Sequence, residues 1–256
     1  MSYVVALVCI AITIALIRAY PRKKVLKVEA FQPAWRAFLA EKVFFYAGLD
    51  ASARERFERG ILDFWAHCAI TGVNTEVTDE DRLLVAASAV IPIFSFPEWR
   101  YTNLDEVLLY PAMFNERFET AGEERGTLGQ VGTGVMSRKM ILSKPALHQG
   151  FAGRKDRLNT GIHEFVHLID ARDGFTDGLP EVLMDRPYAI PWMKLMKQEM
   201  GRINAGRSDI RDYGGVSESE FLPVVSEYFF ERPEQLKEKH PELFAALERM
   251  FKPGAA

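Results

Sequence analysis

The sequence predicts an α+β domain that is predominantly helical and is preceded by an N-terminal transmembrane helix. Three observations lead to this prediction. Apolar side chains recur at helical spacing over most of the chain, two short segments have the composition of strands, and one uncharged apolar run stands at the amino terminus. The 256 residues are 48% hydrophobic, which suffices for a packed core and excludes a wholly disordered chain.

The apolar run covers residues 3–17, and the basic residues of segment 18–27 follow it. As a helix this run is about 22 Å long, against about 30 Å for the hydrocarbon core of a bilayer. Arg18 can snorkel and Tyr20 suits the interface, so we expect an uncleaved membrane anchor over residues 1–27. The basic residues of a signal peptide would instead precede the run. By the positive-inside rule, the chain is expected to cross the bacterial inner membrane once, with residues 28–256 as one domain in the cytoplasm.

Within that domain, apolar stripes and capping residues predict the helices in order. Asp50 or Ser52 can cap the second helix, and Thr78 with Asp81 forms a capping motif for the third, which Pro92 should kink or end. The predicted helices cover 34–47, the stretch after 50–52, 81–94, 156–171, 187–203, 217–230 and a pair within 233–251.

Two strands are predicted, one over Leu104–Tyr110 and one over Lys139–Ser143, which Pro145 should end. The glycine-rich stretch between them, 122–134, predicts an exposed loop.

Charge and cysteine content narrow the function. The net charge of −3 provides no basic field, so we expect no direct nucleic acid binding. Cys9 and Cys68 are the two cysteines, too few for a multi-cysteine zinc site. A metal ion would therefore be bound by histidines and carboxylates.

The string His163-Glu164-Phe165-Val166-His167 lies on a predicted helix and has the H-E-x-x-H pattern. Residues four apart lie on one face of a helix, so both imidazoles can reach one ion, while Glu164 can reach a water beside it. Zinc lowers the pKa of its bound water to about 7, and a neighbouring carboxylate can then remove a proton during attack. The alternative is an ordinary helix with two structural histidines.

A third protein ligand is required if water is to occupy the fourth position. His67, His148 and His240 form no second ligand pair. We expect His67 in the core or at its boundary, His148 in a loop and His240 at a solvated helix boundary. Glu220 and Glu227 lie seven residues apart on one face of a mostly apolar predicted helix, where acids are costly unless they are paired or bind metal.

Two carboxylates have open alternatives. Asp170 shares the face of the histidines and either orients a ligand imidazole or caps the helix end. Glu227 either hydrogen-bonds near the site or pairs with an arginine or lysine elsewhere.

The strings HEFVHLID, ARDGFTDGLP and DYGGVSESEFLPVVSEYFFERPEQL resemble the zinc-dependent peptidases typified by Mlc titration factor A, and the resemblance runs from about residue 31 to 251. It implies a zincin-like metallopeptidase domain of the gluzincin type, with a small β-sheet beside the H-E-x-x-H helix. It also implies that strand 139–143 borders the cleft, where an extended peptide could add. The family's aromatic-acidic turn after this strand is replaced here by SKPALHQG, which leaves substrate preference open.

The resemblance also implies roles for single residues. One Zn²⁺ per chain would be bound by His163, His167 and Glu220, with Glu164 as the catalytic base. Tyr213, seven residues before the third ligand, would lie near the metal and could donate a hydrogen bond to the oxyanion.

The predicted function is hydrolysis of peptide bonds in a peptide or protein substrate by a zinc metallopeptidase, with exopeptidase activity, as in an aminopeptidase, implied by the resemblance. The alternative is a membrane-tethered regulator that binds and sequesters a transcriptional repressor.

Overall fold

The computed structural model of the chain describes residues 30–112, 129–131, 138–153, 158–184 and 186–252. A four-stranded sheet has the order β1-β2-β4-β3, formed by β1 (Ala69–Gly72), β2 (Glu106–Tyr110), β3 (Gly129–Val131) and β4 (Lys139–Ser143). Strands β1, β2 and β4 run parallel, and β3 pairs antiparallel with β4, Gln130 opposite Ile141. Val107, Leu109 and Leu142 are completely buried, so the central strands supply the apolar layer on which helices pack.

The helices before the sheet's central strands are α2 (Pro33–Lys42), α3 (Phe44–Ala47), α4 (Ala51–His67) and α5 (Asp79–Ile93). Asp50 caps α4 by accepting a hydrogen bond from the backbone of Ala53, and Thr78 and Asp81 form the predicted capping box of α5. Pro92 stands in the last turn of α5, which ends one residue later.

The remaining helices follow β4. They are α6 (Lys144–Ala152), α7 (Thr160–Asp170), α8 (Ala189–Asn204), α9 (Glu218–Glu231), α10 (Pro233–Lys239) and α11 (Pro241–Phe251), with short 3₁₀ turns η2 (Ala171–Asp173), η3 (Arg186–Tyr188) and η4 (Asp212–Gly215).

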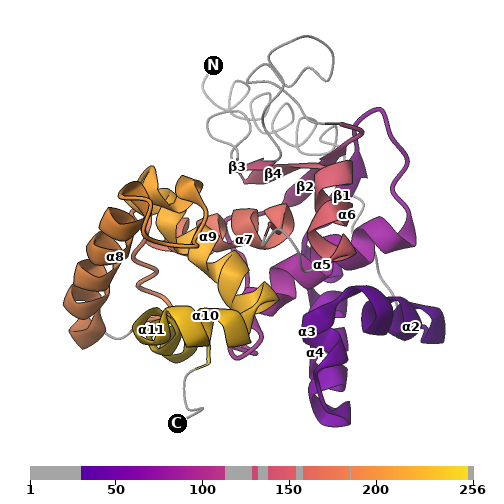
Figure 1. Cartoon of the computed structure of the whole chain (residues 1–256). Coiled ribbons are helices and arrows are strands. Elements are labelled where there is room, and N and C mark those ends of the chain that lie inside the picture. The colour runs from indigo at the N-terminus through magenta and orange to yellow at the C-terminus, as the bar shows by residue number, and fades with distance from the viewer. Residues whose placement is uncertain (1–29, 113–128, 132–137, 154–157, 185, 253–256) are drawn as a thin grey trace, which may run out of the picture.

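Helix α7 lies at the centre of the molecule (Figure 1). It packs against α5, α6 and α9 and also contacts β3 and β4, so the sheet lies beside it. Helices α8 to α11 group on one side of α7, and α2 to α4 on the other (Figure 1). One hydrophobic cluster extends from Phe31 to Phe251 and encloses the apolar face of α7. The central helix is therefore held from several directions, as a site that needs fixed geometry requires.

Before strand β4, two local predictions were wrong and one strand was not predicted. The predicted helix 34–47 is divided at Val43, whose backbone is extended (φ −104°, ψ 97°), because both Val43 and Tyr46 are buried in the core. Strand β1 was not predicted, since its four residues carry little pattern of their own and pair with β2. Part of the predicted loop 122–134 is strand β3, and the rest of that loop lies outside the described residues.

Strand β4 does not border an open edge of the sheet. It pairs with β2 on one side and with β3 on the other, so a peptide cannot add to it. The strand ends at Ser143, as predicted, and Pro145 stands in the first turn of α6, which Ser143 caps with its side chain. His148 consequently lies on a helix, and the predicted loop there was wrong.

The predicted fold class and location need a correction. Across the described ranges, no helix combines the length and apolar character that a membrane span requires. Helix α5, for example, has fifteen residues and starts with three acids, against about 20 apolar residues for a span. The described structure therefore gives no support to the transmembrane helix in the predicted fold class or to the predicted single-pass location in the inner membrane, and the apolar run 3–17 is itself short for a bilayer. Residues 1–27 lie outside the described ranges, so the predicted boundary at residue 28 stays a prediction.

Candidate metal centre

Helix α7 presents the two motif histidines on one face. Asn159 caps the helix, its side-chain oxygen accepting a hydrogen bond from Ile162 N at 3.0 Å. The apolar side chains around the rest of this helix, with Ile162, Phe165 and Val166, are completely buried. The imidazole rings of His163 and His167 lie with centroids 4.8 Å apart. The two imidazoles therefore lie on one face of the helix, as the spacing of four residues predicts. Burial of the apolar side chains in the core fixes the direction in which this face points.

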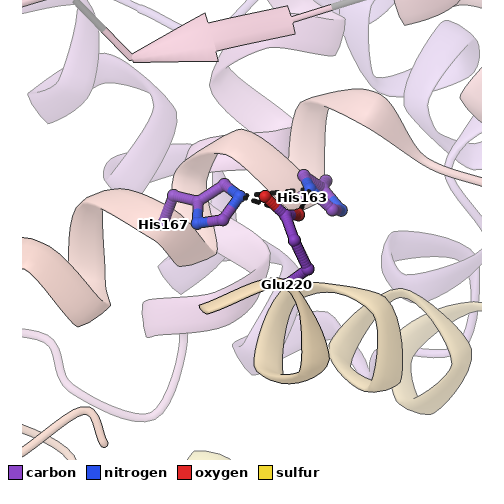
Figure 2. A group of neighbouring side chains, drawn as sticks. All are labelled: His163, His167 and Glu220. Atoms are coloured by element: carbon purple, nitrogen blue, oxygen red, sulfur yellow. Dashed lines mark hydrogen bonds and ion pairs between the residues drawn. The ribbon is translucent and has the colours of Figure 1, made fainter. Parts of the chain in front are cut away.

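Helix α9 brings Glu220 to the same point. Ser217 caps this helix, and the packing of α9 on α7 places the Glu220 carboxylate between the imidazoles (Figure 2). Its Oε2 lies 3.1 Å from His163 Nε2 and 3.4 Å from His167 Nε2, and the two Nε2 atoms are 3.2 Å apart. Within the described part of the chain, these three residues are the group whose donor atoms could hold a metal ion.

The triangle of donor atoms fits a tetrahedral cation. A tetrahedral zinc ion with bonds of about 2.0–2.1 Å spaces its ligand atoms about 3.3 Å apart. The three measured separations, 3.1, 3.2 and 3.4 Å, lie around that value. Two imidazole nitrogens and one carboxylate oxygen also form a donor set common in catalytic zinc sites.

Glu227 supports the triangle from behind. The carboxylate is completely buried on α9, and its Oε1 accepts a hydrogen bond from His163 Nδ1 at 2.8 Å. It also accepts hydrogen bonds from Arg211 Nη2 and from the backbone N–H of Asn159. Both alternatives left open by the sequence thus occur together: Glu227 bonds a motif imidazole and pairs with an arginine.

The protonation states of His163 and Glu220 depend on each other. Burial opposes the charged form of His163, but hydrogen bonds to Glu220 and Glu227 outweigh it and raise the pKa of this imidazole to about 10. Burial likewise disfavours ionised Glu220, yet hydrogen bonds from His163 and His167 lower the pKa of that carboxyl. The triangle therefore attracts one positive charge, and a bound cation would replace the proton.

Glu164 and Tyr213 differ in their exposure. Glu164 is buried, and burial raises the pKa of its carboxyl. Tyr213, on η4, is 47% exposed, and its ring centroid lies 6.0 Å from that of His163. Partial burial and the neighbouring Glu220 carboxylate raise the pKa of its phenol, which keeps the hydroxyl proton in place. The structure thus places Tyr213 beside the triangle with one side open to solvent.

The side chain of Asp170 contacts the turn that follows α7. Its Oδ2 accepts a hydrogen bond from Gly178 N at 2.9 Å, while Oδ1 is buried without a hydrogen-bond partner among the described residues. Burial raises the pKa of this carboxyl to about 6. Asp170 therefore fixes the loop that follows the motif helix, and its observed hydrogen bond is not to an imidazole.

The other histidines lie elsewhere. His67 is exposed at the end of α4, and His148 Nε2 bonds the buried Asp81 at 2.6 Å. His240 is buried, contrary to the predicted solvated boundary, because Glu199 and Asp209 accept its two ring N–H groups.

Sequence reasoning missed Arg211 and Asn159. A buried Glu227 carboxylate needs a cation and backbone donors, so a search for an arginine near Tyr213 could have found Arg211.

A family model described as glucose-regulated metallo-peptidase M90 matches residues 17–252. Uncharacterized protein slr2042 of Synechocystis sp. is 30% identical over 254 residues, 93% of this chain and 92% of that protein. Mlc titration factor A of Pectobacterium atrosepticum is 26% identical over 192 residues, 69% of each chain. The protein of the same name from Serratia proteamaculans is 24% identical over 188 residues, 69% of this chain and 70% of that protein. The predicted resemblance is confirmed, and the chain belongs to the family of glucose-regulated metallo-peptidases M90.

Proposed function

We propose that this chain is a zinc-dependent peptidase that hydrolyses peptide bonds. The observation that carries the proposal is the triangle formed by His163 Nε2, His167 Nε2 and Glu220 Oε2, with sides of 3.1 to 3.4 Å. The triangle stands next to the buried Glu164, and the chain belongs to a metallo-peptidase family. His163, His167 and Glu220 would bind one zinc ion, leaving a fourth position for water or substrate.

When bound, the ion would lower the pKa of a coordinated water and polarise the substrate carbonyl. Glu164 removes a proton from the attacking water as oxygen bonds to the carbonyl carbon. The same carboxyl then returns that proton to the departing nitrogen as the C–N bond breaks. Burial of Glu164 suits both steps, because a raised pKa lets one carboxyl act as base and then as acid.

Tyr213 stabilises the oxyanion. Its phenol retains its proton, lies beside the His163 ring and is about half exposed to solvent. A hydrogen bond from this hydroxyl to the carbonyl oxygen strengthens as negative charge develops there. The resemblance favours an aminopeptidase, and a peptide-library digest distinguishes removal of amino-terminal residues from internal cleavage.

The proposal is tested with Glu164→Gln. We expect this variant to bind one zinc ion per chain but to lose at least about 10²-fold in hydrolysis rate, because an amide cannot accept the proton. Glu218→Gln, which changes a half-exposed acid on the helix of Glu220 that pairs with Lys197, is the matched control and should keep the parent rate. Equal hydrolysis by parent and Glu164→Gln would contradict the mechanism, and full zinc stoichiometry in His163→Ala would contradict the site.

The names of the relatives favour a second candidate function. Several similar proteins are called Mlc titration factor A, which suggests that this chain binds a transcriptional repressor such as Mlc. Isothermal titration of Mlc into parent and Glu164→Gln protein separates the two functions. Equal repressor binding by both proteins, with no peptide hydrolysed by either, would favour the regulator over the peptidase.

A further inference from the structure

The buried carboxylate of Glu227 joins three parts of the site. It accepts the Nδ1 proton of His163 at 2.8 Å, the backbone N–H of Asn159 at the start of α7, and an N–H of Arg211. A carboxylate without solvent contact requires a compensating cation, because desolvation of an unpaired charge costs several kcal/mol. Among the residues that the structure describes, Arg211 is the cation with a permanent charge that pairs with Glu227.

Arg211 comes from a different segment than the ligands. It stands immediately before η4, and its backbone oxygen accepts a hydrogen bond from Gly214 N at 2.9 Å. That bond closes the turn on which Tyr213 lies. The side chain of Arg211 is about one-quarter exposed, whereas Glu227 is completely buried. The arginine therefore reaches inward from the turn of Tyr213 to the carboxylate behind His163.

We propose that Arg211 is a positioning residue of the metal centre. Its guanidinium holds the Glu227 carboxylate in place, and Glu227 in turn holds the His163 ring with Nε2 directed at His167 and Glu220. A hydrogen-bonded carboxylate behind a ligand imidazole fixes both the tautomer and the orientation of the ring. This inference rests on the proposed function only in assuming that the triangle binds a metal ion, and it does not depend on peptide hydrolysis.

A merely structural role for Arg211 makes a different prediction. If the ion pair only pins η4 to α9, its loss lowers the stability of the protein and leaves the zinc affinity of the folded protein unchanged. If Arg211 acts through Glu227 on His163, its loss weakens zinc binding, and the loss disappears once Glu227 is already neutral.

The experiment measures the zinc dissociation constant of the full chain by competition with a chromophoric chelator, with folding checked by circular dichroism. Arg211→Gln and Glu227→Gln should each bind zinc about 10- to 100-fold more weakly than the parent. The double variant should bind within about two-fold of Glu227→Gln, because the arginine then has no carboxylate to hold. Arg211→Lys should recover part of the affinity.

Arg202→Gln is the matched control, because Arg202 pairs with Glu199 at 2.9 Å away from the triangle, and it should bind as the parent does. A folded Arg211→Gln variant that binds zinc as tightly as the parent would overturn this inference and leave the proposed function standing. If that variant does not fold, the comparison of Glu227→Gln with the double variant decides, and a further tenfold loss in the double variant overturns the inference. A parent that binds no zinc overturns both this inference and the proposed function.

Discussion

A Cβ atom at Gly178 would lie 2.5 Å from the carbonyl oxygen of Glu218, the first residue of the helix that carries Glu220. Gly178 also has φ +75°, a conformation that other residues adopt at a cost of about 1–2 kcal/mol. The turn after the motif helix is therefore packed directly on the start of α9. This contact connects the two helices that supply the metal triangle.

Gly178→Ala should lower the free energy of unfolding by about 2–4 kcal/mol, which combines backbone strain with overpacking. Gly174→Ala is the control, because Gly174 has φ +102° but no atom within 4 Å of a Cβ, so strain alone should cost about 1–2 kcal/mol. Urea denaturation of both variants measures the difference. Equal losses at the two positions would show that the close approach to Glu218 is not tight in solution.

The packing of α5 on α7 makes a second prediction. A Cβ atom at Gly161 would lie 2.1 Å from Ser88 Oγ, so Gly161→Ala must push the motif helix away from α5. The variant should lose about 1–3 kcal/mol, although alanine is the better helix former by about 1 kcal/mol.

Ser88→Gly removes the obstructing atoms and provides the partner for a double-mutant cycle. The double variant should be more stable than the sum of the single changes predicts by at least about 1 kcal/mol. Strictly additive losses in urea denaturation would mean that α5 and α7 do not touch at this point.

The hydrogen bonds of His240 lead to the prediction that the free energy of unfolding depends on pH. Its two ring nitrogens bond Glu199 at 3.1 Å and Asp209 at 2.8 Å, and the Glu199 hydrogen bond is the leading cause that raises the pKa of this imidazole. A raised pKa in the folded state means that the stabilisation is complete below the unfolded value of about 6.5 and is lost as the pH rises through the folded value.

His240→Gln should therefore be most destabilised relative to the parent near pH 5–6, and the gap should narrow as the pH rises above about 6.5. Urea denaturation from pH 5 to 9 measures it. His67→Gln, which removes an exposed imidazole, controls for the loss of a histidine as such. A gap that stays constant or widens with pH would exclude a charged His240 in the folded protein.

Local patterns in the sequence were sufficient for much of the helical framework. The capping box of Thr78 and Asp81 involves residues three apart, and the common face of His163 and His167 follows from a spacing of four. Such relationships depend on the geometry of a single helix, which the residues themselves fix. Strand β4 was predicted with its observed bounds for the same reason, since its residues carry their own pattern.

The sequence by itself determined the motif helix, its two imidazoles and the carboxylate between them. The tertiary structure brings Glu220, which the resemblance had named as the third ligand, to His163 across 57 residues of chain. It also pairs Glu227 with Arg211 and, away from the metal triangle, buries His240 between two acids. These contacts join separate elements, so they depend on how a shared apolar core packs α7 against α9, and no spacing along the chain encodes that packing. Strand β3 belongs to the same class, because its backbone pairing with β4 needs no side-chain pattern.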